Sequence, residues 1–351
     1  MRVMVLQSPG GSMSVRGGWI RALIHAGHEA AWWSPREKSA FDAFQEYEPS
    51  LTILTTYDLD DAQEKCIRAR PDMKVALFAS AWGEKADALP LEEFPIVRVT
   101  DAEKRRLERL KRETGKPDCV FLHCSDSNVE SVLGGWREIG IEPIGLMNAA
   151  DALLYRPGRF RPEFACDACF VGGRWPYKAR NIDPFILSLA EHAPFRLKVF
   201  GYGGWEDTTP YYLGRLDELD EPDLFASSAV CLNVSEPHST DPRYASDIVE
   251  RPFKVMACGG CLVSDHVEEM KEIFPFVPTA RTREDFRDLA EYLLERPDER
   301  QWLSSEGRAE VMSRHTYHHR MYRLFHRLGW PQEGDRILTS LPKIWGRTSH
   351  D

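Results

Sequence analysis

The sequence lacks an apolar stretch long enough to cross a bilayer, since no run among its 351 residues approaches the ~20 apolar residues that a membrane helix needs. It also lacks a leader-like start, because residues 1–6 lead directly into a strand-like run whose only charge is Arg2. From these two absences we expect a cytoplasmic protein without membrane insertion.

Positive charge and cysteine are also scarce. Lys and Arg number 45 against 55 Asp and Glu, a net charge of −10, which weighs against generic nucleic-acid binding because that binding neutralises phosphates. Eight cysteines are too few for a disulfide scaffold in a chain of this length. The pairs Cys166/Cys169 and Cys258/Cys261 lack the context of a zinc knuckle, so we interpret them as buried thiols and expect no metal site.

What the sequence does contain is an alternation of strand-like and helical segments. The strand-like segments of the first half are 2–7, 29–33, 51–54, 75–78, 96–99, 119–122 and 144–147, with helical patterns such as 101–113 and 128–139 between them. A second series has strand-like segments at 168–171, 197–200, 230–234 and 261–264. The alternation predicts an α/β protein with two Rossmann-like, doubly wound parallel sheets.

The alternation pauses at residues 149–164, where two prolines stand among charged residues. We therefore predict an N-terminal domain at 1–149, a C-terminal domain at 150–329, and a tail at 330–351 that packs back on the first domain.

The loop at residues 8–18 is the first candidate site, because ligands of doubly wound sheets bind at the carboxyl ends of strands. Gly10 and Gly11 allow a ligand to approach the backbone, and the following helix N-terminus favours an anion. The pattern is not Gly-x-Gly-x-x-Gly, and no acidic residue closes strand 29–33, which argues against a nicotinamide dinucleotide. The alternative is an ordinary strand–helix connection.

A second candidate is the segment 171–180, where Gly172 and Gly173 precede Arg174 and Lys178. Such cations and a helix N-terminus suit a diphosphate, and the alternative is a solvated basic loop.

The third candidate is the segment 247–265, in which Glu250 and Lys254 lie four residues apart on one helix face. The carboxylate suits ribose hydroxyls and the ammonium suits a phosphate. The alternative is a surface ion pair.

Glu250-Arg-Pro-Phe-Lys-Val-Met-Ala-Cys-Gly-Gly260 resembles the donor-binding segment of spore-maturation-type (CgeB-like) glycosyltransferases, which belong to the two-domain GT-B superfamily. The further matching segments are 262–264, 272–274, 166–173, 197–205, 231–234 and 315–320. The resemblance covers about residues 148–320, and the first 147 residues match only in architecture.

This resemblance implies the metal-independent transfer of a hexosyl or pentosyl group from a nucleotide-sugar, most simply a UDP-sugar, to an acceptor, with no tightly bound cofactor. It assigns the donor to the C-terminal domain and the acceptor to the N-terminal domain. The donor-binding residues that it implies are Gly172, Gly173 and Arg174 at the diphosphate, Gly201 and Tyr202 at the base, and Glu250, Arg251 and Lys254 under the ribose and phosphates. Many relatives have Glu at the position of Lys254, so we expect Glu250 to take the ribose role.

An inverting transfer needs a base on the acceptor hydroxyl. By topology the candidates are His123 and Asp126, near the end of strand 119–122, and Asp58, after strand 51–54. A helix cap or a surface role is the alternative for each of them, and a retaining mechanism needs no such base.

The segment 104–116 holds seven cations and two acids. It suggests a second hypothesis for the function, a glycosyltransferase that acts on modified-base DNA, although a solvated helix face with intrahelical ion pairs has the same pattern. An epimerase or hydrolase of the same architecture is a third hypothesis. The departure at Lys254 suggests a fourth, a catalytically degenerate nucleotide-sugar-binding protein.

Overall fold

The computed structural model describes residues 1–7, 13–84, 98–191, 195–205, 209–235 and 248–341. The chain forms two compact units, which are Met1–Met147 with Tyr317–Asp351, and Asn148–Thr316. The chain therefore returns to the first unit at Tyr317, thirteen residues before the start of the tail predicted at 330.

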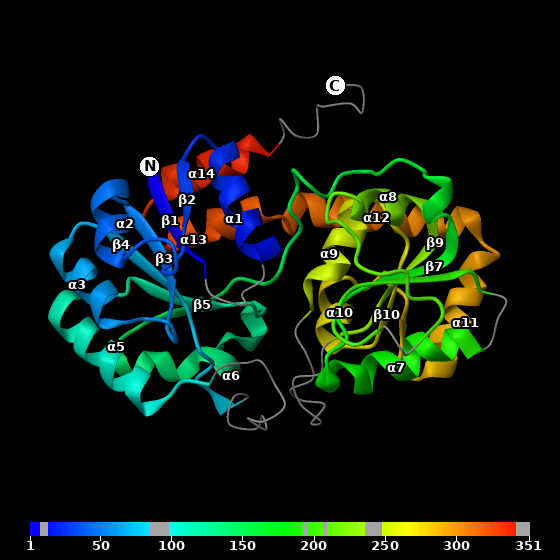
Figure 1. Ribbon diagram of the computed structural model, residues 1–351, viewed down its shortest axis with the longest axis horizontal. Helices are drawn as coiled ribbons and strands as arrows, with labels where there is room; N and C mark the ends of the chain where they lie inside the picture. Colours follow the sequence, from blue (N-terminus) through cyan, green and yellow to red (C-terminus); the bar gives the residue numbers. More distant parts are fainter. Residues whose placement is uncertain (8–12, 85–97, 192–194, 206–208, 236–247, 342–351) are drawn as a thin grey trace. The chain divides into compact units, whose positions relative to one another are not determined.

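The first unit is built around a six-stranded parallel sheet of order β2-β1-β3-β4-β5-β6 (Figure 1). Its strands are β1 (Arg2–Leu6), β2 (Glu29–Trp33), β3 (Leu51–Thr55), β4 (Lys74–Phe78), β5 (Cys119–Leu122) and β6 (Pro143–Gly145). Its helices are α1 (Met13–His25), α2 (Ala40–Tyr47), α3 (Asp61–Ala69), α5 (Asp101–Thr114), α6 (Val129–Leu133), α13 (Tyr317–Arg327) and α14 (Pro331–Ser340). All five residues of β3 are buried, because helices cover both faces of the sheet.

Two elements predicted for this unit are not seen as single complete elements: one strand is described only in part, and one helix is divided. The strand predicted at 96–99 lies mostly outside the described residues, although Arg98 forms an isolated parallel bridge with Ala81. The helix predicted at 128–139 is divided into η1 (Asp126–Asn128), α6 and η2 (Gly134–Ile139). The division falls at two glycines. A Cβ on Gly135 would lie 2.3 Å from the Trp82 ring, so a glycine is needed here for the backbone to approach the indole closely.

The C-terminal helices complete the first unit. The orange-red α13 and the red α14 of Figure 1 pack on each other, and both contact the blue α1. A Cβ on Gly18 would lie 2.1 Å from the ring of Tyr317, so glycine allows α13 to approach α1 closely. His25 Nδ1 lies 3.2 Å from His318 Nε2 in the same contact.

The second unit has a five-stranded parallel sheet of order β11-β10-β9-β7-β8. Its strands are β7 (Cys166–Val171), β8 (Leu197–Phe200), β9 (Ser228–Asn233), β10 (Leu262–Asp265) and β11 (Thr279–Ala280). Its helices are η3 (Pro162–Phe164), α7 (Pro176–Glu191), α8 (Glu221–Ser227), α9 (Glu250–Ala257), α10 (Glu268–Ile273), α11 (Arg283–Leu294) and α12 (Pro297–Arg314). The two parallel sheets confirm the predicted fold class of two doubly wound α/β units.

Among the described residues, no helix is both long and apolar enough to cross a membrane.

Candidate functional site

The second unit has its topological switch point between β7 and β9. The chain leaves β7 toward β8 on one side and then crosses to β9 on the other side, so β7 and β9 are neighbours in the sheet. Connections that depart in opposite directions leave a crevice at the carboxyl ends of such strands, and ligands of open α/β sheets bind there. A ligand site is therefore expected at the residues around Val171 and Asn233, at the ends of β7 and β9.

Arg251 lies across this switch point. It is the second residue of α9, and its Nε donates to the carbonyl of Val171 at the end of β7. Its Nη1 donates to Asn233 Oδ1 at 2.7 Å, at the end of β9, and the guanidinium carbon lies 4.4 Å from the centre of the Phe170 ring. The guanidinium thus joins both strands and places positive charge at the switch point.

A buried polar network holds the strand ends beside Arg251. Asn233 Nδ2 donates to Ser264 Oγ at 2.8 Å, and Ser264 Oγ donates to Asp265 Oδ1 at 3.1 Å. The backbone N–H and the hydroxyl of Ser235 both donate to the same Asp265 oxygen at 2.9 Å. Burial raises the pKa of Asp265, while these donors and the charge of Arg251 act in the opposite direction.

Two glycines at this edge have almost no space for a side chain. Gly201 has φ of 151°, and a Cβ there would lie 1.9 Å from the carbonyl oxygen of Gly172. A Cβ on Gly172 would lie 2.4 Å from Arg251 Nη2. The loops after β7 and β8 therefore meet backbone to backbone beside the guanidinium, which is the close approach that glycine permits.

The structure places Arg174 and Lys178 mainly against their own loop. Arg174 Nε and Nη2 form a bidentate pair with Asp183 at 2.8 and 2.6 Å, and Nη1 donates to the carbonyl of Gly204 at 2.8 Å. Lys178 Nζ lies 4.3 Å from the centre of the Trp175 ring. Arg174 thus fixes the loop after β7 to the loop after β8.

An aromatic pair stands at the same loops. The ring centres of Trp175 and Tyr202 are 5.0 Å apart, with the rings nearly perpendicular, and Tyr202 is 47% exposed. A Cβ on Gly173 would lie 2.6 Å from the Trp175 ring, so glycine at this position leaves the space that the indole occupies.

Lys254 is surrounded by carboxylates. Its Nζ lies 3.3 Å from Glu250, 3.6 Å from Glu221 and 3.8 Å from Glu218. It also lies 4.9 Å from the ring of Tyr155, whose hydroxyl donates to Glu218 at 2.9 Å. The carboxylates raise the pKa of Lys254 although burial alone lowers it, and burial raises the pKa of Glu221. We call these four charged residues the Lys254 cluster.

Helix α9 contains a proline in its first turn. The helix begins at Glu250, so Pro252 is its third residue. Its missing N–H costs nothing there, because the first-turn N–H groups of a helix have no intrahelical partner.

In the first unit, His123 follows β5 and is wedged between aromatic rings. Its centroid lies 4.9 Å from that of Phe78 and 5.9 Å from that of Trp19. Its Nδ1 lies 3.0 Å from the carbonyl oxygen of Leu146. Because a carbonyl only accepts, the neutral ring carries its proton on Nδ1, and Nε2 is then the basic nitrogen.

The two aspartates proposed with His123 have different surroundings. Asp126 is 71% exposed and pairs with Arg323 at 2.5 Å. Asp58 accepts from Thr55 Oγ1 at 2.9 Å and lines a shallow hollow beside β3 together with Arg106. Asp126 is the first residue of η1 and Ser125 is the capping position, so the capping role considered for Asp126 is not seen.

The remaining predictions concern two glycines, the cysteines and the presence of a metal site. Gly10 and Gly11 lie outside the described residues. All eight cysteines are free and buried, and burial raises the pKa of Cys166 and of Cys261 to about 12, which keeps both thiols protonated. Within the described ranges no group of His, Cys, Asp and Glu side chains is arranged to hold a metal ion.

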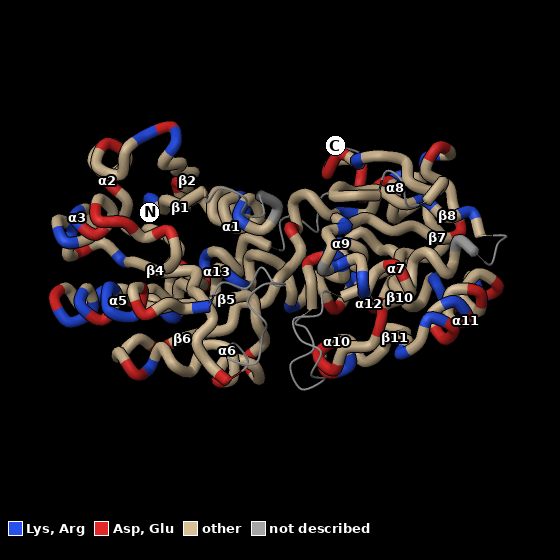
Figure 2. The backbone as a smooth tube through the Cα atoms, turned by 60° about the horizontal axis from the view of Figure 1, so that its bottom comes forward, with Lys and Arg blue, Asp and Glu red and all other residues tan. Residues whose placement is uncertain are grey.

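The basic segment falls on α5 and its C-terminal flank. Figure 2 shows Lys and Arg interspersed with Asp and Glu along α5. Arg106 pairs with Asp61 at 2.8 Å and with Glu64 at 3.2 Å, and Arg109 pairs with Glu64 at 3.4 Å. Lys111 donates to the carbonyls that follow the helix. The acids of α3 thus pair with two of the cations that a DNA backbone would need.

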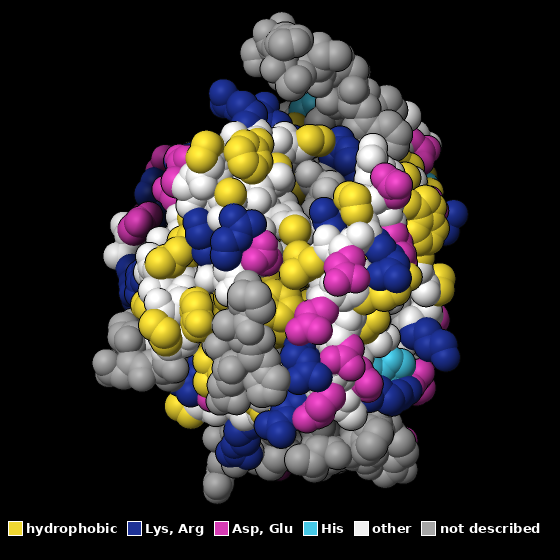
Figure 3. Space-filling view, turned by 90° about the vertical axis from the view of Figure 1, so that its right-hand side faces the viewer, with side chains coloured by type: hydrophobic (Ala, Val, Ile, Leu, Met, Phe, Trp, Pro, Cys, Tyr) yellow, Lys and Arg dark blue, Asp and Glu magenta, His cyan; other side chains and the backbone are white. Residues whose placement is uncertain are grey.

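The face of the second unit seen in Figure 3 intermixes cationic, anionic and hydrophobic side chains. A surface of this kind lacks the single-sign stripe typical of a nucleic-acid interface.

The sequence-based prediction named Arg251, Gly172 and Gly201, but it did not include the polar network beside Arg251. Asn233 and Asp265 are the last residues of β9 and β10. A polar residue that closes an apolar strand is a signal that the sequence does contain, and Cys231-Leu-Asn and Leu262-Val-Ser-Asp both show it.

Comparison with known proteins finds one family model and several solved structures that are similar to this chain. A family model described as glycosyl transferase-like matches residues 180–326. Comparison with curated proteins gives no match. Sucrose-phosphate synthase from Thermosynechococcus elongatus is similar in structure with a TM-score of 0.61 at 12% identity, over 93% of this chain and 99% of that one.

Two further solved structures are similar at comparable identity. BGT of T4 phage, in complex with its UDP-glucose substrate, has a TM-score of 0.56 at 10% identity and covers 97% of this chain and 99% of its own. S. aureus MnaA, in a structure with UDP, has a TM-score of 0.54 at 9% identity and covers 93% of this chain and 95% of its own. The chain therefore has the two-domain fold of the GT-B glycosyltransferases, and its residues 180–326 are similar to the glycosyl transferase-like family.

Proposed function

We propose that this protein is a glycosyltransferase of the CgeB-like type that moves a hexosyl or pentosyl group from a UDP-sugar to an acceptor hydroxyl. The second unit binds the donor and the first unit binds the acceptor. The observation that carries this proposal is Arg251, whose guanidinium joins the ends of β7 and β9 at the switch point. The family match over 180–326 and the UDP-glucose and UDP complexes of similar structures support it.

In this proposal the diphosphate lies beside the loops after β7 and β8, which carry Gly172, Gly173 and Gly201. Arg251 and the N-terminus of α9 offset the charge that develops on the leaving diphosphate, so the step needs no metal ion. Glu250, the first residue of α9, accepts from the ribose hydroxyls.

Three further residues support the donor site in this proposal. Tyr202, whose ring is 47% exposed, borders the base. Arg174 and Lys254 act through their neighbours, because Arg174 holds the loops together and Lys254 holds Glu250.

The proposed chemistry at the acceptor uses His123. The acceptor oxygen bonds to the anomeric carbon while the bond from that carbon to the diphosphate oxygen breaks, and the nucleoside diphosphate leaves with the electron pair. The hydroxyl proton passes to Nε2 of His123, because Nδ1 already donates to Leu146. His123 is preferred over Asp126, whose carboxylate is exposed and paired with Arg323.

The proposal is tested by measuring the affinity of the full chain for UDP and for UDP-sugars by calorimetry. Arg251→Gln removes a charged donor, and a charge-assisted hydrogen bond contributes about 1.5–3 kcal/mol, so we expect the affinity to fall about 10- to 100-fold. Arg281→Gln is the matched control, because Arg281 is an exposed arginine of the same unit that pairs with Glu268. Circular dichroism shows whether each variant is folded.

Turnover distinguishes a transferase from a hydrolase, an epimerase or a binding protein. A transferase releases UDP faster when an acceptor is supplied, whereas a hydrolase or epimerase forms product without one. A degenerate binding protein binds UDP-sugars and turns over none. A folded wild-type protein that binds no nucleoside diphosphate contradicts the proposal.

A further inference from the structure

The first unit contains a buried cation that lacks a carboxylate partner among the described residues. Arg16 is 7% exposed, and its Nη1 donates to the carbonyl of Leu6 at 3.0 Å. No described Asp or Glu forms an ion pair with it. By contrast, buried Lys116 pairs with Asp118 at 3.1 Å, and Lys254 has three carboxylates around it.

A buried guanidinium without a counter-ion is unfavourable, because it has lost its hydration and gained little in return. It has five N–H donors, and the Leu6 carbonyl uses only a small part of them. Their planar fork matches the oxygen pairs of a carboxylate or a phosphate. An oxyanion is therefore the ligand that suits the guanidinium of Arg16.

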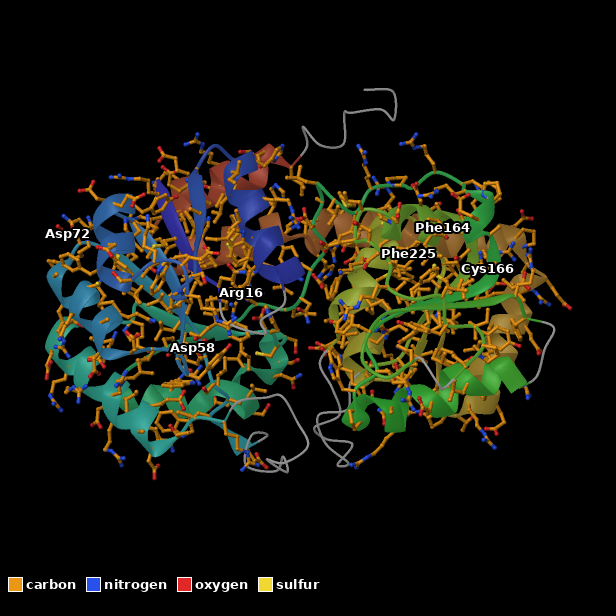
Figure 4. All side chains as sticks on the ribbon, in the orientation of Figure 1. Arg16, Asp58, Asp72, Phe164, Cys166 and Phe225 are labelled. Carbon is orange, nitrogen blue, oxygen red and sulfur yellow. The ribbon has the colours of Figure 1, made fainter. Side chains whose placement is uncertain are left out.

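The position of Arg16 is also that of a ligand site. It lies in the first turn of α1, whose N-terminus favours negative charge, at the carboxyl end of β1 (Figure 4). Strands β1 and β3 are neighbours whose connections leave in opposite directions, so this edge is the switch point of the first unit.

Arg16 also shares a helix face with a residue that contacts His123. Arg16 and Trp19 are three residues apart and hence on one side of α1. The Trp19 ring lies 5.9 Å from that of His123. The buried cation and the basic nitrogen assigned above are therefore presented at the same edge of the sheet.

We propose that Arg16 binds the oxyanion, a carboxylate or a phosphate, of the acceptor, so that the acceptor is an acidic molecule whose reacting hydroxyl stands near its anionic group. The assignment of the anion to the acceptor rests on the proposed function. The anion site itself rests only on the burial of Arg16 and on the lack of a described counter-ion.

Thermal unfolding of the full chain in inorganic phosphate, against sodium chloride of equal ionic strength, tests the anion site. We expect phosphate to raise the unfolding temperature of the wild type by several degrees and to raise that of Arg16→Met by less than half as much. The matched control is Arg105→Met, since Arg105 lies on the exposed face of α5, and it should respond like the wild type.

The same experiment separates a binding role from a structural one. Without phosphate, Arg16→Met should unfold at the wild-type temperature or above it, because the change removes a buried charge that has no described counter-ion. A lower unfolding temperature together with an unchanged response to phosphate would overturn the proposal, since a merely structural arginine behaves in this way.

Titration with UDP assigns the anion to acceptor or donor. We expect the affinity of Arg16→Met to stay within about twofold of the wild type. A loss of about tenfold would place Arg16 at the donor diphosphate and overturn the acceptor assignment. If the wild type binds no nucleoside diphosphate, the proposed function fails, while the phosphate measurement still decides whether Arg16 is an anion site.

Discussion

Replacing Lys254 by methionine should expose the electrostatic cost of the Lys254 cluster. Nζ lies within 3.8 Å of Glu218, Glu221 and Glu250, and the Lys254 side chain is only 13% exposed. Methionine has a similar length and no charge, so the substitution changes charge far more than packing. The variant leaves three carboxylates together without their cation.

The magnitude follows from the burial of the partners. Removing one member of a buried ion pair typically costs about 3–5 kcal/mol. Glu221 and Glu250 have side chains that are 11% and 15% exposed, while Glu218 is 39% exposed and partly screened by solvent. We therefore expect Lys254→Met to lower the free energy of unfolding by about 3 kcal/mol at neutral pH.

The effect should depend on pH with a definite sign. Burial raises the pKa of Glu221 above its ordinary value of 4.5, and Lys254 opposes this rise, so removing Lys254 raises the pKa further. A carboxyl whose pKa is higher in the folded state destabilises the fold only when it is ionised. The deficit should be small near pH 4.5, grow as the pH rises through the raised folded pKa, and be largest above it.

The assay is urea unfolding, followed by tryptophan fluorescence, at neutral pH and near pH 4.5. Lys271→Met is the matched control, since Lys271 is an exposed lysine of α10 in the same unit. Adding Glu221→Gln to Lys254→Met removes one of the repelling charges and should recover part of the loss. A deficit below about 1 kcal/mol, or one equal at both pH values, would refute the reasoning.

Two further predictions concern a glycine and a histidine. Gly201→Ala places a Cβ 1.9 Å from the Gly172 carbonyl and should lower the free energy of unfolding in urea by more than about 3 kcal/mol. The control Gly214→Ala, with open space around it, should lower it by about 1 kcal/mol. Equal losses in the two variants would contradict this prediction. Burial lowers the pKa of His318 to about 3, below its ordinary 6.5. The neutral side chain therefore contributes its full share of the folding stability above pH 6.5, and this share is lost as the pH falls. Between pH 7 and 5 this loss is about 2 kcal/mol, and His318→Asn should abolish it; an unchanged pH dependence of unfolding argues against the assignment.

The strand and helix periodicities were sufficient to predict the two parallel sheets. The strands predicted at 51–54 and 197–200 correspond to β3 (Leu51–Thr55) and β8 (Leu197–Phe200), because buried parallel strands are short apolar runs. The sequence predicted a returning tail from residue 330, whereas the first unit includes the chain from Tyr317. Sequence alone does not locate this point, since a helix has the same 3.6-residue period whichever unit its apolar face packs on.

The candidate site could be predicted only in part. Glycines at strand ends identify Gly172 and Gly201 from local sequence, because close backbone approach excludes larger residues. The partners of Lys254 could not be found in this way. Glu218 and Glu221 are more than thirty positions away in sequence, and no local pattern shows that they meet its ammonium.

The sequence by itself determined the fold class, most of the strands and the glycines of the strand-end loops, because periodicity and backbone freedom are local properties. Tertiary structure alone decided which charges are neutralised. It placed Lys254 among three carboxylates and Arg174 against Asp183, and it left Arg16 buried without a described carboxylate partner. The physical reason is that the effect of a charge depends on its burial and on neighbours that only folding brings together.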